Sequence, residues 1–182
     1  MTDSLVLVLG GARSGKSRYA ESRIAEIPGE RIYVATGEAG DAEMAARIAE
    51  HRRRRGAAWR TVEEPLELAT TLSAIGSTGT GSTGTAILVD CLTLWLANLL
   101  GAQRDPVVET ERLLAVLPEI GAAVFMVSNE VGLGIVPDNA EARRFRDAAG
   151  RLHQSIAAVA DEVVLVVAGL PNVVKRPSTE ST

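Results

Sequence analysis

The run Gly10–Ser17 constrains this chain more than any other feature, because it lies between an apolar stretch and a segment of helical character. It reads Gly-Gly-Ala-Arg-Ser-Gly-Lys-Ser, which matches the phosphate-loop pattern G-x-x-x-x-G-K-[ST]. Residues 5–9 before it are predicted to form a strand, and residues 17–24 after it a helix. The glycines let consecutive backbone N–H groups turn toward a triphosphate, and the helix N-terminus adds the positive end of its dipole. The pattern therefore predicts a nucleoside triphosphate site.

Two side chains of this loop are predicted to have chemical roles. Lys16 is expected to reach the β- and γ-phosphates and to act in catalysis, and the Ser17 hydroxyl to ligate Mg²⁺. The chain holds only two lysines, Lys16 and Lys175, so a lysine here favours a ligand site over a glycine-rich turn without a ligand. We assign the whole loop to the nucleotide site: Gly10, Gly11, Ala12, Arg13, Ser14, Gly15, Lys16 and Ser17.

Apolar runs alternate with helical segments along the rest of the chain. Strands are predicted at 5–9, 31–35, 86–89, 123–127 and 163–167, and further helices at 41–55, 65–75, 92–101, 106–119 and 138–160. Strands separated by helices of this length give βαβ units and a parallel sheet with helices on both faces. Right-handed crossovers place the ligand along the edge where the strands' carboxyl ends meet. The predicted fold class is α/β, a three-layer P-loop NTPase-type fold with a mainly parallel sheet flanked by helices.

Length and composition indicate one domain with an aliphatic core. The chain has 182 residues, of which 46% are hydrophobic and only 3% aromatic, so Val, Leu, Ile and Ala must fill the core. We predict a single nucleotide-binding domain over residues 1–176 and a disordered tail over 177–182. Residues 76–85 repeat Gly-Ser-Thr-Gly-Thr twice. This segment lacks lysine and precedes a strand rather than a helix, so we predict a solvated linker and not a second phosphate loop.

Several classes of protein are excluded or disfavoured. No apolar run approaches the ~18 residues that a membrane span needs. The first strand is not preceded by the basic segment that is typical of a signal peptide. A single cysteine, Cys91, excludes an internal disulfide framework and a multi-cysteine zinc site. The net charge of −4 argues against nucleic acid as a partner. We expect a cytoplasmic protein that does not insert stably into membranes.

Asp90 closes the apolar run Ala-Ile-Leu-Val and is a second candidate site residue. Many strands end in Asp because its side chain favours turns. Beside a phosphate loop, however, such a carboxylate holds Mg²⁺ directly or through water, so we assign Asp90 to the nucleotide and metal site. These residues leave three classes open: a small-molecule kinase, a GTPase switch, and an ATP-driven motor or RecA-like protein. A GTPase switch needs an Asn-Lys-x-Asp run, which lysines at 16 and 175 alone cannot provide.

His51 lies on the same predicted helical stripe as Met44 and Ile48, and the four residues after it, 52–55, are all arginine. One interpretation is a packing histidine beside a solvated or nucleic-acid-binding basic face. Four consecutive helical residues fan around the axis, however, and are better placed to surround a compact polyanion. Their charges disfavour protonation of the imidazole, which would then be a nucleophile toward phosphate. His153 has no such neighbours and is interpreted as a surface or packing residue.

The chain resembles the bifunctional adenosylcobinamide kinase/adenosylcobinamide-phosphate guanylyltransferases of cobalamin synthesis. The resemblance rests on the phosphate loop and on a series of segments in the same order. These segments are 33–36, 43–48 with His51, 59–63, 90–93, 128–137, 144–150 and 168–169. The run Ser-Asn-Glu-Val-Gly-Leu-Gly-Ile-Val-Pro at 128–137 is the most specific of them. Nearly the whole chain is covered, except for the repeat and the tail.

The resemblance implies two reactions with GTP and ATP as substrates and Mg²⁺ as cofactor. In the first, adenosylcobinamide is phosphorylated; in the second, a histidine matching His51 takes GMP from GTP and passes it to adenosylcobinamide phosphate. It also implies a homo-oligomer, a trimer. A plain metabolite kinase in which His51 only packs remains the alternative. The further nucleotide contacts that we assign with this resemblance are Ala35, Thr36, Gly37, Arg52, Arg53, Arg54, Arg55 and Glu63, of which Glu63 is expected to accept from guanine rather than to be a solvated turn acid.

Overall fold

The computed structural model describes residues 4–37, 53, 56–78 and 84–176. They form one seven-stranded sheet in the order β3-β2-β4-β5-β1-β6-β7. Every neighbouring pair is parallel except β6 and β7, which are antiparallel. The strands are β1 (Leu5–Gly10), β2 (Glu30–Ala35), β3 (Arg60–Glu63), β4 (Thr85–Asp90), β5 (Ala123–Asn129), β6 (Glu162–Val167) and β7 (Leu170–Lys175).

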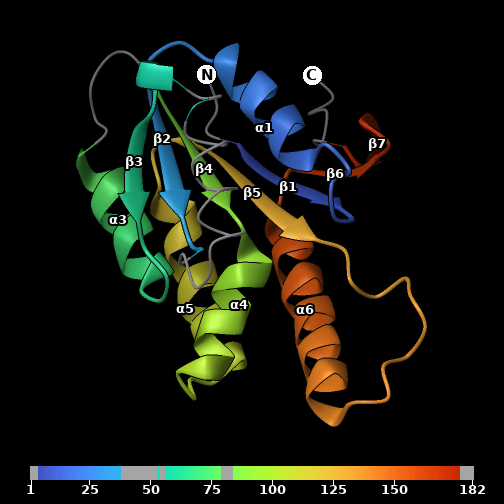
Figure 1. Ribbon diagram of the computed structural model, residues 1–182. Coiled ribbons are helices and arrows are strands. Elements are labelled where there is room, and N and C mark those ends of the chain that lie inside the picture. The colour runs from blue at the N-terminus through green and yellow to red at the C-terminus, as the bar shows by residue number, and fades with distance from the viewer. Residues whose placement is uncertain (1–3, 38–52, 54–55, 79–83, 177–182) are drawn as a thin grey trace, which may run out of the picture.

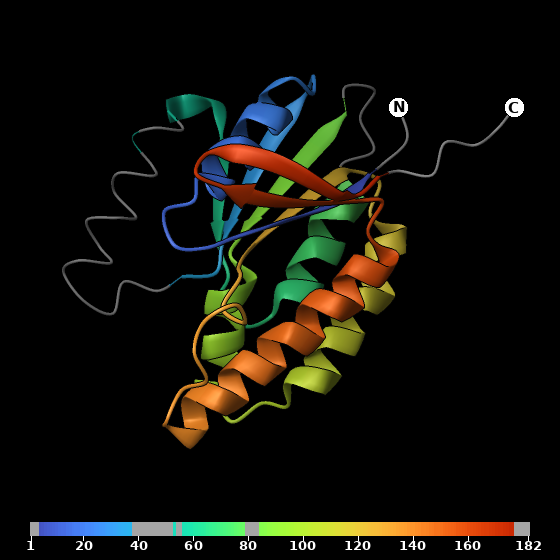
Figure 2. The ribbon, with the colours of Figure 1, turned by 90° about the vertical axis from the view of Figure 1, so that its right-hand side faces the viewer.

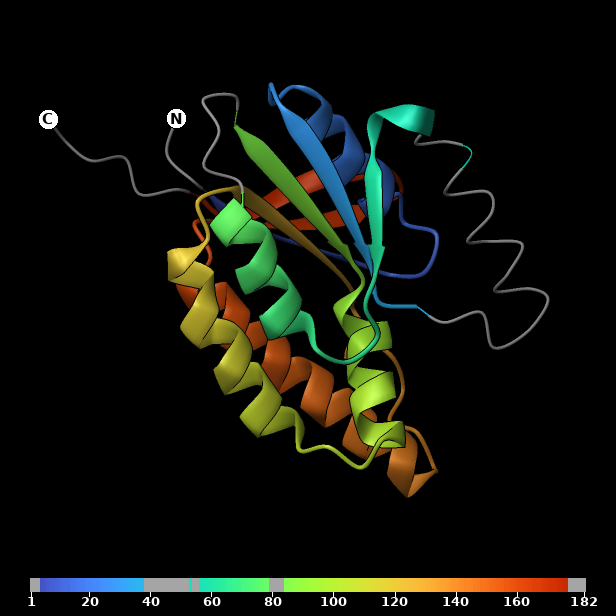
Figure 3. The same cartoon turned by 90° about the vertical axis from the view of Figure 1, so that its left-hand side faces the viewer.

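Helices cover the sheet on both faces (Figure 1). One face carries α1 (Lys16–Ala25), while the helices that follow β3 gather on the other face, as the two side views show (Figures 2 and 3). Those on the second face are α3 (Leu68–Thr78), α4 (Leu92–Gly101), α5 (Pro106–Val116) and α6 (Ala140–Val159). Two short 3₁₀ turns, η1 (Gly56–Ala58) and η2 (Leu117–Glu119), complete the described elements.

The alternation of side chains along β1 divides the core into two layers. Val6 and Val8 pack with Ala20 and Ile24 of α1, whereas Leu7 packs into the larger cluster formed with α3, α4, α5 and α6. Because a strand buried on both faces needs apolar residues at every position, the run Leu-Val-Leu-Val-Leu is what this central strand requires. The predicted α/β class and the mainly parallel sheet are confirmed.

The sequence-based prediction missed the two strands at the edges of the sheet. β3 exposes three of its four residues, and β7 contains Pro171 and exposes four of its six residues. Edge strands bury little surface and therefore leave no apolar run to detect. The helix predicted at 65–75 begins later, at Leu68. The helix predicted at 41–55 lies outside the described residues except for Arg53, which is helical and exposed.

The Gly/Ser/Thr repeat is also structured at both ends, contrary to the prediction of a ten-residue linker. Helix α3 runs on to Thr78, and β4 begins at Thr85, which is buried. A Cβ atom on Gly76 would lie 3.2 Å from the Cα of Ile120, so the helix approaches its neighbour closely there. The first three residues of the repeat, 76–78, therefore complete a helix, and residues 79–83 lie outside the described part of the chain.

Among the described residues, no helix is both long enough and apolar enough to cross a membrane. Residues 177–182 lie outside the described part of the chain, so the disordered tail stays a prediction, as does a cytoplasmic location.

Candidate nucleotide site

The predicted phosphate loop connects β1 to α1, as expected. Lys16 begins α1, is only 9% exposed, and its Nζ donates to the carbonyl oxygen of Gly11 at 3.2 Å. The backbone of Arg13 (φ 56°) and Gly15 (φ 95°) lies in the left-handed region, where glycine is favoured. These conformations fold the loop into a compact turn at the N-terminus of α1, which is the arrangement that presents N–H groups to an anion.

Glycine is required at two positions of the loop because other atoms come too close. A Cβ on Gly10 would lie 2.4 Å from Ser14 Oγ and 2.6 Å from the carbonyl oxygen of Val166. One on Gly15 would lie 3.2 Å from the Cα of Gly169, whose N–H donates to the carbonyl oxygen of Ser14 at 2.8 Å. The turn between β6 and β7 thus holds the back of the phosphate loop, a contact that the sequence analysis did not foresee.

Asp90 ends β4, and a single strand, β5, separates β4 from β1. Its carboxylate oxygen Oδ2 is buried and has no hydrogen-bond partner among the described residues, and the same is true of Ser14 Oγ in the phosphate loop. Buried polar atoms normally have partners, so the unpartnered Asp90 Oδ2 at this edge is a candidate to bind a ligand atom. The arrangement fits Mg²⁺, which takes one or two protein ligands and completes its shell with water and phosphate oxygens.

Cys91 shows that the charges of the loop and of β4 lie near each other. Burial is the main cause that raises the pKa of the Cys91 thiol, and the nearby carboxylate of Asp90 raises it further. The hydroxyl of Thr93 and the positive charge of Lys16 act in the opposite direction. The thiol is therefore neutral, and the charges of both Lys16 and Asp90 influence its pKa.

Thr36 holds the end of β4 in place. Its hydroxyl donates to the carbonyl oxygen of Cys91 at 2.7 Å and accepts from the Cys91 N–H at 2.8 Å, while its own N–H donates to the carbonyl oxygen of Asp90 at 3.3 Å. The side chain of Asn98 donates to the carbonyl oxygens of Thr36 and Pro65. The structure thus gives the buried Thr36 hydroxyl a positioning role, and its predicted contact with the nucleotide stays a prediction, as do those of Ala35 and Gly37.

Glu63 ends the edge strand β3, where it lies opposite Ala35 and is exposed. β3 is four places from β1 in the sheet. At about 4.8 Å per strand this separation is ~19 Å, so Glu63 lies at the far end of the carboxyl edge from the phosphate loop. His51, Arg52, Arg54 and Arg55 lie outside the described residues, and their predicted roles stay predictions together with that of Arg53.

The end of β5 completes the centre of this edge. Asn129 lies opposite Gly10, and the N–H of Glu130 donates to the carbonyl oxygen of Gly10 at 3.0 Å. The side chain and the N–H of Asn129 both donate to Thr93 Oγ1, at 3.1 and 3.3 Å. The sequence predicts no role for these residues beyond the family resemblance, but their place in the sheet sets them between the phosphate loop and Asp90.

His153 is a buried packing residue, which is one of the two interpretations offered from the sequence. Its Nε2 hydrogen-bonds Ser128 Oγ at 2.7 Å, and its Nδ1 lies 3.9 Å from Glu130 Oε2. Burial lowers the pKa of His153, and the nearby Glu130 carboxylate opposes this shift only in part. The imidazole is therefore held neutral behind β5.

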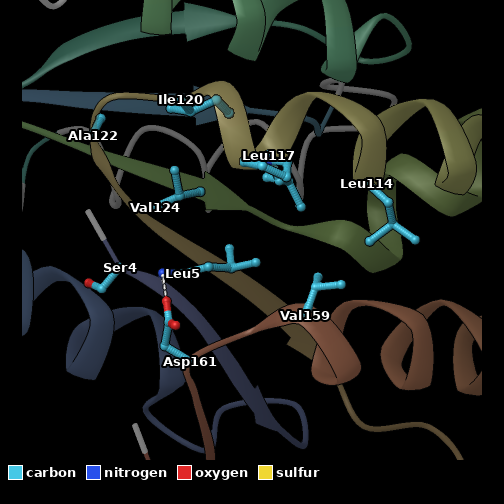
Figure 4. Close-up of a pocket in the computed structure, with 10 residues that line it drawn as sticks. Ser4, Leu5, Leu114, Leu117, Ile120, Ala122, Val124, Val159 and Asp161 are labelled. Atoms are coloured by element: carbon cyan, nitrogen blue, oxygen red, sulfur yellow. Dashed lines mark hydrogen bonds between the residues drawn. The ribbon is translucent and has the colours of Figure 1, made fainter. Parts of the chain in front are cut away.

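A cavity elsewhere in the molecule does not carry this chemistry (Figure 4). It lies where β1 and β5 begin, at the opposite edge of the sheet from the phosphate loop, and most of its lining is aliphatic. Its one carboxylate, Asp161, accepts from the Leu5 N–H at 2.7 Å and is thereby engaged in the fold.

Solved structures with a similar fold include ATPases of bacterial type III secretion systems. One prototypical ATPase of this kind matches with a TM-score of 0.54 and 12% identity, covering 89% of this chain and 50% of the other. EscN from enteropathogenic E. coli, assembled with its stalk EscO, matches with a TM-score of 0.59 and 12% identity over 90% of this chain and 42% of the other. This chain spans about half the length of the first of these ATPases and less than half the length of the second. At such identity the likeness shows the fold alone.

Sequence comparison gives closer relatives. Residues 6–174 match the family model "Cobinamide kinase / cobinamide phosphate guanyltransferase". A bifunctional adenosylcobalamin biosynthesis protein, CobP of Pseudomonas aeruginosa, is 52% identical over 91% of this chain and 94% of its own length. CobU of Salmonella typhimurium, with the same description, is 44% identical over 91% of this chain and 97% of its own length. The chain therefore belongs to the cobinamide kinase/cobinamide phosphate guanyltransferase family, a family of transferases.

Proposed function

We propose that this protein first phosphorylates adenosylcobinamide with a nucleoside triphosphate. It then transfers GMP from GTP to adenosylcobinamide phosphate through a guanylylated His51. The observation that carries the proposal is the buried Lys16 of a well-formed phosphate loop in a chain of this family. One strand, β5, separates the strand before this loop from β4, which ends in Asp90 with its unpartnered carboxylate oxygen.

In the kinase step, the hydroxyl oxygen of the aminopropanol arm attacks the γ-phosphorus. The bond from that phosphorus to the β–γ bridging oxygen breaks, the nucleoside diphosphate leaves, and the hydroxyl proton is lost to solvent. Lys16 and the backbone N–H groups of the loop stabilise the negative charge that builds on the phosphate oxygens. Mg²⁺ held by Ser17 and Asp90 would supply further neutralisation of the phosphates.

In the guanylyl step, an imidazole nitrogen of His51 attacks the α-phosphorus of GTP. The bond to the α–β bridging oxygen breaks, pyrophosphate leaves, and GMP is held through a phosphorus–nitrogen bond. A phosphate oxygen of adenosylcobinamide phosphate then attacks the same phosphorus, and the phosphorus–nitrogen bond to His51 breaks. The product is adenosylcobinamide-GDP, with His51 restored. Two displacements through a covalent intermediate replace one difficult displacement.

Charge and base selection support the same proposal. Pyrophosphate is a highly charged leaving group, and Lys16 together with Arg52, Arg53, Arg54 and Arg55 would stabilise it. Glu63 is exposed at the end of β3 and would accept from the N1–H and the 2-amino group of guanine. Adenine has an acceptor at N1, so a carboxylate there favours GTP. A trimeric assembly belongs to the same proposal.

The experiment that tests this proposal is incubation of the pure protein with GTP labelled at the α-phosphate. We expect a covalent label that acid removes and alkali does not, as for a phosphorus–nitrogen bond to imidazole. Addition of adenosylcobinamide phosphate should then discharge the label into product. A plain metabolite kinase takes up no label at all, and a label stable to acid would place the nucleophile on another kind of side chain.

A further inference from the structure

Three exposed aliphatic side chains gather in the loop between β5 and α6. Leu133 is 84% exposed, Ile135 is 97% exposed and Val136 is 57% exposed. The loop stands away from the body of the protein beside α6 (Figure 1). A group of large aliphatic side chains in water is unfavourable, and such groups mark binding sites on soluble proteins.

The loop is held in a defined shape. At its start, Glu130 Oε1 accepts from the Gly132 N–H at 2.6 Å. At its end, the guanidinium of Arg143 donates to the carbonyl oxygens of Pro137 and Asp138 at 2.8 and 2.6 Å. Asn139 then caps α6 by accepting from the next two backbone N–H groups. Hydrogen bonds at both ends leave the aliphatic residues between them pointing outward from a fixed frame.

The loop begins at the centre of the nucleotide site. Glu130, at its start, donates its N–H to the carbonyl oxygen of Gly10 in the phosphate loop. Figure 2 shows the β5–α6 loop and the phosphate loop on the same side of the molecule. Leu133 and Ile135 follow Glu130 by only three and five residues, so a molecule lying against them is on the same side of the protein as the phosphate loop.

We propose that Leu133, Ile135 and Val136 form the docking surface for the corrin ring of the acceptor. This inference rests on the function proposed above. The ring is large, carries methyl groups and neutral amide arms, and must lie near the site so that its aminopropanol hydroxyl reaches the γ-phosphorus. Residues 131–137 contain no charged side chain, so their aliphatic surface matches the methyl groups of the ring and offers nothing to a second anion.

A second copy of the chain is the competing occupant, but another surface suits it better. Val167, Leu170 and Val174 are exposed at the outer side of the sheet, where β7 is the edge strand. An edge strand offers backbone donors and acceptors as well as apolar side chains to a protein partner. Val174, at the other end of β7 from the β6–β7 turn, and Val159, at the end of α6, provide a matched control, since both are aliphatic and exposed and lie toward the edge of the sheet opposite the phosphate loop.

The test compares the double variant Leu133→Ser/Ile135→Ser with the control variant Val159→Ser/Val174→Ser. We expect the first to raise the KM for adenosylcobinamide in the kinase reaction by about tenfold or more, because two aliphatic side chains no longer bury their surface against the ring. Its KM for the nucleoside triphosphate and its labelling by GTP alone should equal those of the wild type. The control variant should keep the wild-type KM for adenosylcobinamide.

Three results would overturn the proposal. The KM for adenosylcobinamide is unchanged in the loop variant; or both variants raise it equally; or the loop variant has a smaller mass in sedimentation, which would make this loop an interface between copies. If the wild-type protein itself phosphorylates no corrinoid, the proposed function fails, and the docking surface with it. If the wild-type enzyme is active and the loop variant has an unchanged KM for adenosylcobinamide, only the docking surface is rejected and the proposed function stands.

Discussion

The centre of the sheet's carboxyl edge and its β2–β3 flank are built in different ways. At the centre, the phosphate loop, Asp90 and the end of β5 are tied by backbone hydrogen bonds and by glycines that admit no side chain. At the flank, Thr36 engages its hydroxyl in holding β4, and the exposed Glu63 sits on a short edge strand. The centre has the geometry of a phosphate site, whereas the proposed function assigns to the flank the side chains that distinguish one reaction from the other. This difference predicts which variants affect both activities and which affect one.

The largest effect is expected for Lys16→Ala, at the centre. Removing the charge that stabilises the reacting phosphates costs about 3 kcal/mol or more in each transition state, so both kinase activity and GMP transfer should be lost. Initial rates of both reactions are the measurement. Lys175 is the matched control, because its Nζ donates to the carbonyl oxygens of Ala157 and Ala158 at the end of α6, away from the phosphate loop. Lys175→Ala should keep both rates, and near-normal phosphoryl transfer by Lys16→Ala would contradict the site.

His51→Ala tests whether the two activities can be separated, because the proposed function gives His51 a role in GMP transfer only. We expect GMP transfer and covalent labelling to disappear while phosphorylation of adenosylcobinamide persists, because Lys16, Ser17 and Asp90 remain. Labelling with α-labelled GTP and a separate kinase assay measure the two activities. Equal losses of both activities would show that His51 packs or serves a shared function.

The other histidine, His153, provides the control for this experiment, and its buried contacts decide which substitution is suitable. His153 is buried and bonded to Ser128, so replacement by Ala would leave a cavity and an unpartnered hydroxyl. His153→Gln keeps a polar group within reach of Ser128. It should lower the melting temperature modestly and leave labelling and both activities in place.

Asp90→Asn is expected to have an intermediate effect, confined to the metal requirement. An amide binds Mg²⁺ more weakly than a carboxylate, so the Mg²⁺ concentration for half-maximal activity should rise by roughly tenfold in both reactions. Ser17→Ala should shift the titration in the same direction. Metal titrations of the two variants that coincide with the wild type would remove both residues from the metal site.

Glu63→Gln tests the flank for base selection. A glutamine cannot accept from both the N1–H and the 2-amino group of guanine, so KM for GTP in the transferase reaction should rise by about tenfold. The kinase reaction with ATP as donor should be unaffected. Glu64 is a matched control for general charge effects, although it is engaged in the fold: its carboxylate accepts from Leu66, Glu67 and Thr71. An equal effect of Glu64→Gln on KM for GTP would show that Glu63 acts only through charge.

The centre could be read from the sequence because its information is local. Eight consecutive residues specify the phosphate loop, and an acid at the end of an apolar strand specifies Asp90. The contacts that hold this region were not readable, since Gly169 and Thr36 act on residues far away in the chain. β3 and β7 were missed because each has one unpaired edge and an exposed pattern. Packing by distant residues leaves no period in the sequence, and the family resemblance included residues 59–63 but stopped before β7.

The smallest effect is expected for a change outside both regions, in the repeat before β4. Insertion of a third Gly-Ser-Thr-Gly-Thr copy after Gly79 doubles the five-residue connection between Thr78 and Gly84. The added loop entropy costs only ~0.6 kcal/mol, so melting temperature should fall slightly and both activities should persist. Gly76→Leu, only a few residues away, should cost more, about 1–3 kcal/mol, because the new side chain meets Ile120. Thermal unfolding of the two variants makes the comparison. If the insertion destabilises as much as Gly76→Leu, the connection is itself part of the packed structure.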